Sequence, residues 1–421
     1  MYHRLPRFAC FTRNTLALAA IGLFAMPGWA ADASTEDRLK ALEARLDAME
    51  KENRSLKQQL QQTDQKVEAT GDQVEKIASQ GATGNSALAS WAEKTQLGGY
   101  GELHLNQLNN KNPAGEDKKE MDLHRFVLFF GHQFNDRLRF FSELEVEHNI
   151  VEGGHGAVEL EQAYLDFALT DRLSVKAGSF LLPIGIINET HEPTVFYGVE
   201  RNPVETYIIP ATWWEGGVGM TSRLDNGFTI DGAITTGMKA DAADDYAVRA
   251  ARQELSEGTK AKSPAYTARL KWAGVPGIEI AGSVQYQSDI AQDLDATAGA
   301  AKLYEAHAII NRGGFGLKAL YARWRLDGSG PATVGADKQF GWYVEPSFKI
   351  NDSWGLFARY NRWDNQAGSG DAFDSRFSQT DFGVNYWPHP DVVIKADWQT
   401  QQAPAGKDEF DGFNVGIGYR F

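Results

Sequence analysis

Residues 95–421 alternate apolar and polar side chains in about sixteen short runs, and this two-residue period limits the possible folds more than any other feature. In a membrane-spanning barrel, each strand points one side chain to lipid and the next into the lumen, so a polar chain can cross a bilayer. No window has the roughly 18 consecutive apolar residues that a transmembrane helix needs. Because backbone groups in lipid must be hydrogen-bonded internally, a closed barrel is the remaining way to cross.

Connection lengths separate a barrel from a water-soluble β-sandwich, which would show the same alternation. Seven tight turns alternate strictly with eight longer polar segments, which predicts sixteen antiparallel strands with both ends on one side. The turns are at residues 135–137, 170–172, 225–227, 274–277, 311–314, 351–353 and 389–391. The longer segments are 107–120, 148–157, 181–211, 238–264, 288–301, 327–338, 364–379 and 400–409. Short periplasmic turns and long outer loops are typical of an outer-membrane barrel.

A cleaved export signal is predicted over residues 1–30. It has a positive start, an apolar stretch over 16–26, and Gly28 and Ala30 as small residues before the cleavage site. A short membrane anchor is the alternative, but it would need about 20 apolar residues. Cleavage removes the single cysteine, Cys10, and three arginines but no acid, so the net charge of −14 becomes −17. The mature chain then has no thiol, and its acidity argues against a nucleic-acid partner.

Residues 31–78 change to a heptad period. Apolar or neutral residues recur at alternating spacings of three and four from Leu39 to Ile77, which predicts a periplasmic α-helical coiled coil about 58 Å long. Asn53 at a core position would fix the register without choosing the number of strands. A single solvated helix is the alternative, because the second half is poor in leucine and contains Gly71. Residues 79–94, rich in Gly, Ala and Ser, predict a flexible linker to the barrel at 95–421.

Three barrel segments resemble the phosphate-selective porin O and P family. The most specific runs from Glu189 to Gly219 as ETHEPTVFYGVERNPVETYIIPATWWEGGVG; the others are QAYLD at residues 162–166 and the stretch 379–397. The resemblance covers most of residues 95–421 and implies a trimeric, sixteen-stranded outer-membrane channel. The last strand, which ends on Tyr419 and Phe421, also resembles the C-terminal signal that barrel-assembly machinery reads.

The long segment after Phe180 is the third outer loop, which in sixteen-stranded porins folds into the lumen and narrows it. Its four acids against one arginine predict a negative loop that faces basic residues on the wall, and thus a transverse field. A solvated external loop and ordinary lumen charge are the alternatives. The pore-lining candidates are Glu189, His191, Glu192, Glu200, Arg201 and Glu205 on the loop, and Arg269, Lys318, Arg359 and Lys395 on the wall.

These features favour a passive diffusion channel in the Gram-negative outer membrane, without a cofactor or metal. The expected partners are outer-membrane lipid, two further copies in a homotrimer, and small hydrophilic solutes or inorganic anions. The resemblance implies phosphate preference, whereas the acidic loop and Glu143, Glu145 and Glu147 favour a general or cation-leaning pore.

Two other function classes stay open. An enzyme could use Glu143 and Glu145 as a carboxylate pair, or His191 and Glu192 near Glu189 as a metal pair, but no HExxH, nucleophile-elbow or phosphate-loop motif is present. A structural protein could tether the outer membrane to the cell wall through the coiled coil.

Overall fold

The computed structural model describes residues 86–148, 156–368 and 374–421. The predicted signal peptide, the predicted coiled coil and the linker as far as residue 85 lie outside the described residues. Residues 86–93, assigned to the flexible linker from sequence, form a helix, α2 (Ser86–Glu93). Ala, Leu and Glu in this segment favour a helix, and the Trp91 ring stacks on His132 with ring centroids 6.1 Å apart.

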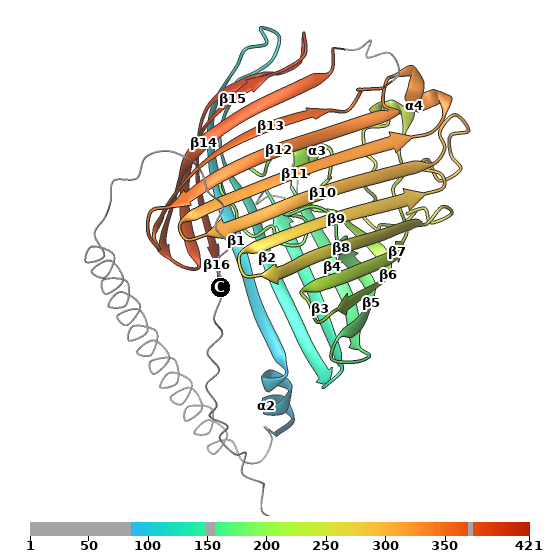
Figure 1. Ribbon diagram of the computed structural model, residues 1–421, viewed down its shortest axis with the longest axis vertical. Helices are drawn as coiled ribbons and strands as arrows, with labels where there is room; N and C mark the ends of the chain where they lie inside the picture. Colours follow the sequence, from blue (N-terminus) through green and yellow to red (C-terminus); the bar gives the residue numbers. More distant parts are fainter. Residues whose placement is uncertain (1–85, 149–155, 369–373) are drawn as a thin grey trace, which may run out of the picture. The chain divides into compact units, whose positions relative to one another are not determined.

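Sixteen antiparallel strands close into a barrel in which β1 pairs with β16, as predicted (Figure 1). Closure leaves no unpaired edge of the sheet. The strands are β1 (Thr95–Asn110), β2 (Lys118–Asn135), β3 (Leu138–Glu147), β4 (Ala157–Ala168), β5 (Leu173–Leu181), β6 (Trp214–Arg223), β7 (Phe228–Thr235), β8 (Ala265–Val275), β9 (Ile278–Gln287), β10 (Ala301–Arg312), β11 (Phe315–Leu326), β12 (Lys338–Lys349), β13 (Trp354–Asp364), β14 (Arg376–His389), β15 (Val392–Gln402) and β16 (Phe410–Arg420).

All seven predicted turns and all eight predicted longer segments fall at connections between strands. We call the two ends of the barrel the turn end and the loop end. The described parts of the loops contain three short helices: α3 (Val204–Tyr207), η1 (Ala242–Asp244) and α4 (Ser329–Thr333). The first loop is shorter than expected, because β1 continues to Asn110, and Lys111 next to it pairs with Glu409 at 2.9 Å and with Asp411 at 2.7 Å.

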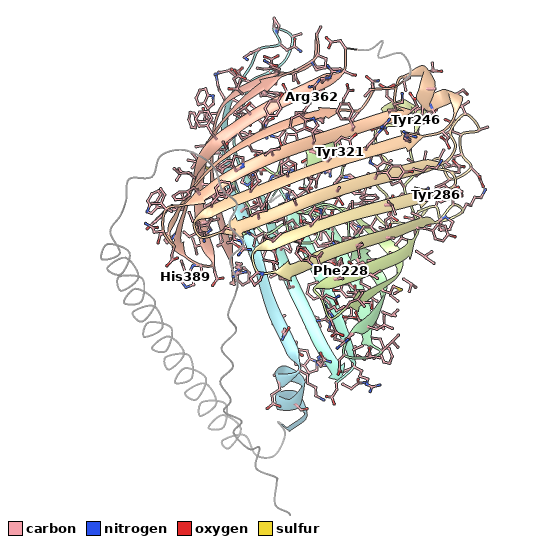
Figure 2. All side chains as sticks on the ribbon, in the orientation of Figure 1. Phe228, Tyr246, Tyr286, Tyr321, Arg362 and His389 are labelled. Carbon is pink, nitrogen blue, oxygen red and sulfur yellow. The ribbon has the colours of Figure 1, made fainter. Side chains whose placement is uncertain are left out.

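The outer face of the wall is apolar and the inner face is mostly polar. In β9, Ile280, Val284 and Tyr286 are exposed, while Ser283 and Gln285 between them are buried; Figure 2 labels Tyr286 and Tyr321 among the side chains of the wall. Such an outer face suits contact with lipid. Other exposed apolar side chains of the strands include Leu128, Leu144, Leu165, Val218, Ile234, Tyr266, Tyr304, Val344, Leu356, Phe382, Ile394, Phe413 and Ile417. Among the described residues, no helix has the length and hydropathy that crossing a bilayer requires.

The hydrophobic core lies inside the barrel. The connection between β5 and β6, residues 182–213, is called the inner loop here; its Ile184, Ile208 and Ile209 are fully buried. They belong to one cluster with inward-facing side chains of β10 to β13, such as Trp324 and Tyr343. Since burying one large aliphatic side chain contributes about 1.5–3 kcal/mol, this cluster holds the loop firmly against the wall.

Candidate functional site: the inner loop and its constriction

The inner loop lies across the lumen and is fastened to several parts of the wall. The Pro183 carbonyl accepts a hydrogen bond from Ser283 on β9 (3.2 Å). The Ile208 carbonyl accepts one from Trp324 on β11 (2.9 Å), and the Gly198 carbonyl accepts one from Lys395 on β15 (2.8 Å). The third loop therefore narrows the passage, as its length and its apolar start predict.

Glu205 stabilises the fold of the inner loop rather than facing water. Its carboxylate is fully buried and accepts hydrogen bonds from the backbone N–H groups of Ile186 (2.6 Å) and Ile187 (2.8 Å). It also accepts one from the Tyr343 hydroxyl on β12 (2.8 Å). Gly185 makes this approach possible, because a β-carbon there would lie 2.5 Å from the Glu205 carboxylate and the backbone φ is +79°.

Arg359 joins three strands to the loop. Its guanidinium lies 3.0 Å from the Asp381 carboxylate on β14 and 3.2 Å from that of Glu345 on β12. It also donates to the carbonyl groups of Tyr197 (3.3 Å) and Glu200 (3.4 Å) in the inner loop. The side chain is only 4% exposed, so it acts as a buried support of the constriction.

Arg269 on β8 has a comparable arrangement. It lies 2.8 Å from Asp231 on β7 and 2.5 Å from Glu189 of the inner loop. Both wall arginines are therefore balanced by wall carboxylates. The field expected between a positive wall and an acidic loop stays a prediction, to which these two arginines contribute less than their full charge, because a buried guanidinium requires an anionic partner.

The remaining predicted residues differ in their access to water. Glu200 is 31% exposed and lies 3.2 Å from His104 on β1. Burial raises the pKa of Glu200, but the charge of His104 and its hydrogen bond outweigh this and lower the pKa well below its usual value. Glu192 and Lys318 are partly exposed, with Lys318 3.9 Å from Glu345, while Lys395 and His191 are buried.

Two cavities lie on either side of the inner loop. The cavity toward the turn end, about 680 Å³, includes Glu189 with Lys176, Arg139 and Asp166 in its lining. The cavity toward the loop end, about 320 Å³, is called the outer vestibule here. It is lined by the predicted pore residue Glu200 and by several residues that were not predicted to line the pore: Glu102, His104, Lys118, His124, Arg125, Glu147 and Arg249.

Three arginines converge beside the outer vestibule at the end of the inner loop; we call Arg201, Arg249 and Arg252 the arginine cluster. Arg201 donates to the Thr212 hydroxyl (3.0 Å), Arg249 donates to the Ala211 carbonyl (2.8 Å), and Arg252 donates to the Thr212 carbonyl. Burial, followed by the charges of Arg252 and Arg201, lowers the pKa of Arg249 to about 10. Only Arg201 was a sequence candidate.

The arginine cluster has spare hydrogen-bonding capacity. Among the described residues, no carboxylate forms an ion pair with any of the three, and the buried Nε and Nη2 of Arg201 have no hydrogen-bond partner. The cluster comes from two loops, so no spacing along the chain could have indicated it. Its donors have the fork geometry that carboxylates and phosphates match.

Comparisons with known proteins agree with this architecture. The family described as phosphate-selective porin O and P matches residues 97–421. An uncharacterized protein of Aquifex aeolicus (strain VF5) is 29% identical over 353 residues, which cover 77% of this chain and 79% of that protein. An anion-selective porin from Comamonas acidovorans has a similar fold, with a TM-score of 0.56, 12% identity, and coverage of 78% of this chain and 99% of that one.

The trimer form of OmpT from Vibrio cholerae also has a similar fold, with a TM-score of 0.51, 10% identity, and coverage of 78% of this chain and 99% of that one. The family match and the closed barrel indicate a channel of the Gram-negative outer membrane rather than an enzyme. The resemblance seen in the sequence is confirmed: the chain belongs to the phosphate-selective porin O and P family.

Proposed function

We propose that this porin is a passive diffusion channel for small hydrophilic solutes and that it prefers oxyanions such as phosphate. The arginine cluster is the observation that carries this proposal. An oxyanion that leaves bulk water needs donors to replace its hydration, and three guanidiniums without ion-paired carboxylates offer them. The Comamonas porin is described as anion-selective, which agrees with an anion preference on this fold.

Acidic residues near the vestibule do not cancel the arginine cluster. Glu102 lies 2.8 Å from Arg125, and Glu200 lies 3.2 Å from His104, so each of these carboxylates already has a cationic partner. The lining includes Lys118, Arg125, Arg201 and Arg249 against the carboxylates of Glu102, Glu147 and Glu200, so it carries one more cation than carboxylate even without its histidines, although the chain as a whole carries −14. Local charge at the narrowest part, rather than net charge, sets the selectivity of a pore.

Reversal potentials in a salt gradient test the proposal. The wild-type channel in a planar bilayer is expected to be anion-selective and to pass phosphate in the presence of chloride. The double variant Arg249→Gln/Arg252→Gln is expected to lower the anion-to-cation permeability ratio by about tenfold per charge. A unit charge about 6 Å away contributes about 0.7 kcal/mol in water, and its loss disfavours the anion and favours the cation by this amount each.

Arg325→Gln is the matched control, because Arg325 is exposed on the outer face of β11 and its substitution removes the same charge far from the lumen. This variant is expected to keep the wild-type reversal potential. A cation-selective wild type, or a double variant that behaves like Arg325→Gln, would contradict the proposed role of the arginine cluster.

We further propose that the channel is a homotrimer and that the heptads of residues 39–77 associate in the periplasm beneath it. The trimer form of OmpT supports a trimer of this fold, and the unbroken heptad spacing supports the association. A tether to the cell wall through the same helices is the second candidate function, favoured by the same heptads.

Deleting residues 36–80 tests the contribution of the heptads. If they hold the trimer together, the deletion is expected to lower the temperature at which trimers dissociate in SDS gels, while single-channel conductance stays unchanged. A full-length chain with Asn53→Leu serves as a comparison, because removing the polar core position stabilises a coiled coil. Equal dissociation temperatures for the deletion and the wild type would show that the heptads are dispensable for assembly.

A further inference from the structure

A second polar cluster lies beneath the inner loop, apart from the arginine cluster. Glu143 on β3, Glu161 on β4 and His191 in the inner loop bring one ligand-type atom each to a common point. His191 Nε2 lies 3.4 Å from a Glu143 oxygen and 3.6 Å from a Glu161 oxygen, and the three atoms lie within 4.8 Å of one another. We call these three residues the buried triad.

The converging atoms have no hydrogen-bond partner among the described residues. This holds for Nε2 of His191, Oε1 of Glu143 and Oε2 of Glu161, and the three residues are 1–3% exposed. Buried polar atoms are nearly always hydrogen-bonded, so three such atoms that face one another require an explanation. A bound ion at their common point would satisfy all three.

The other polar atoms of the triad are already oriented. His191 Nδ1 lies 3.2 Å from the Asn188 carbonyl, to which its N–H donates, so in the neutral imidazole Nε2 carries the lone pair. Glu143 accepts a hydrogen bond from Gln162 Nε2 at 2.7 Å through its second oxygen. Metal-binding histidines and carboxylates are typically held by partners of this kind, which fix the tautomer and aim the free atom at the metal.

The distances fit a first-row divalent metal. Zn²⁺ binds histidine nitrogen and carboxylate oxygen at about 2.0–2.2 Å, so two tetrahedral ligands are separated by about 3.4 Å. The two nitrogen–oxygen distances of the triad agree with this separation. Imidazole together with carboxylates favours Zn²⁺ and its transition-metal neighbours over Ca²⁺ or Mg²⁺, which prefer oxygen ligands alone.

Protonation of His191 is the alternative to a metal ion at the common point of the triad. Burial opposes the charging of His191, but the polar contact and charge of Glu143, with the contact of Glu161, outweigh it and raise the pKa of His191 to about 10. The triad would then be an imidazolium between two carboxylates. Neither the 3.4 Å nor the 3.6 Å contact has hydrogen-bond geometry, however, whereas a metal needs no N–H aligned with either oxygen.

The carboxylates around the triad are not fully balanced by neighbouring positive charges, which favours the binding of a cation. Glu145, the inward-facing residue that follows Glu143 on β3, adds a third carboxylate. The Arg125 guanidinium lies 3.7 Å from the Glu145 carboxylate. Arg125 is shared with Glu102 at 2.8 Å, so it does not balance the triad by itself. Arg201 is the other positive neighbour whose charge influences His191.

We propose that Glu143, Glu161 and His191 bind one divalent transition-metal ion, with Zn²⁺ as the probe, and that this ion fastens the inner loop to β3 and β4. The ion is structural: it fixes the position of residue 191 and takes no part in the passage of solutes. Glu192, which the sequence paired with His191, is not part of the site, because the carboxylates at the common point come from the wall.

Metal content tests the proposal directly. The full-length protein in detergent is stripped with a chelator, loaded with Zn²⁺, freed of unbound metal, and analysed by plasma mass spectrometry. The number of Zn²⁺ ions retained per protomer is expected to be lower by one in His191→Gln, and likewise in Glu161→Gln, than in the wild type. Zn²⁺ is expected to raise the unfolding temperature of the wild type but not of these two variants.

Two controls separate this site from other histidines. Glu192→Gln changes the adjacent loop residue, and His124→Gln removes a histidine of the more open group formed by Asp122, His124 and His148. Both are expected to keep the ion of the buried triad and the Zn²⁺-dependent rise in unfolding temperature. A wild type that retains no Zn²⁺ after loading, or His191→Gln with wild-type metal content, would overturn the proposal in favour of the protonated triad.

Discussion

Glu205→Ala is expected to enlarge the single-channel conductance, because it releases the inner loop from its own fold and from β12. The substitution leaves the N–H groups of Ile186 and Ile187 and the Tyr343 hydroxyl without their acceptor. Hydrogen bonds to a charged group contribute about 1.5–3 kcal/mol each, and lumen water recovers part of this. A net loss of about 3 kcal/mol raises the population of the released loop roughly a hundredfold. Planar-bilayer recordings measure the effect.

Glu192→Ala is the matched control for Glu205→Ala. It removes the same residue type from the same loop, where the side chain is partly exposed, and it is expected to conduct like the wild type. Gly185→Ala is expected to reproduce part of the Glu205→Ala effect, since its β-carbon would displace the carboxylate. Wild-type conductance in Glu205→Ala would show that the apolar cluster alone positions the loop.

Arg359→Ala is expected to destabilise the barrel by about 3–5 kcal/mol, because it leaves the buried carboxylates of Glu345 and Asp381 without a counter-charge. It also removes the donor to the Tyr197 and Glu200 carbonyls. Folded and heat-unfolded barrels migrate differently in SDS gels, so the midpoint of this transition measures the loss. Arg359→Lys is expected to lie between the wild type and Arg359→Ala, since one ammonium cannot replace a guanidinium that serves both carboxylates.

Lys318→Ala is the control on the same wall. Its ammonium is 3.9 Å from Glu345 and partly exposed, so the expected change is at most about 1 kcal/mol. Adding Glu345→Gln and Asp381→Asn to Arg359→Ala is expected to restore much of the stability, because the uncompensated charges disappear. If Arg359→Ala unfolds at the same temperature as Lys318→Ala, the buried pairs do not support the barrel.

The wall of the barrel was predictable in detail. Strand parity follows from a period of two, so the inward position of Glu143, Tyr343 and Lys395 followed from their alternation with outward apolar neighbours. The sixteen strands followed from the alternation of short and long connections. The ends of the strands were predicted less accurately, as β1 shows, because a polar or charged residue outside the lipid layer can either extend a strand or begin a loop.

The contents of the lumen were predictable only in part. The length and apolar start of the inner loop indicated that it packs inward, and Glu189, Glu200 and Arg201 do border the two cavities. Glu205 and His191 lie on the same acidic loop but are fully enclosed, and sequence alone does not distinguish the two environments. The position of each side chain depends on partners from distant strands, such as Tyr343 for Glu205 and Glu161 for His191.

The sequence by itself determined the closed wall, its strand number and, in the strands with clear alternation, which side chains face inward, because these depend on periodicity and on the lengths of neighbouring connections. Tertiary structure alone decided which inward charges meet. It paired the wall arginines with wall carboxylates, brought Arg249 and Arg252 from one loop to Arg201 of another, and placed His191 between Glu143 and Glu161. The physical reason is that a charge enclosed in the lumen requires a partner within a few ångströms, and closing the barrel selects that partner from strands far apart in the chain.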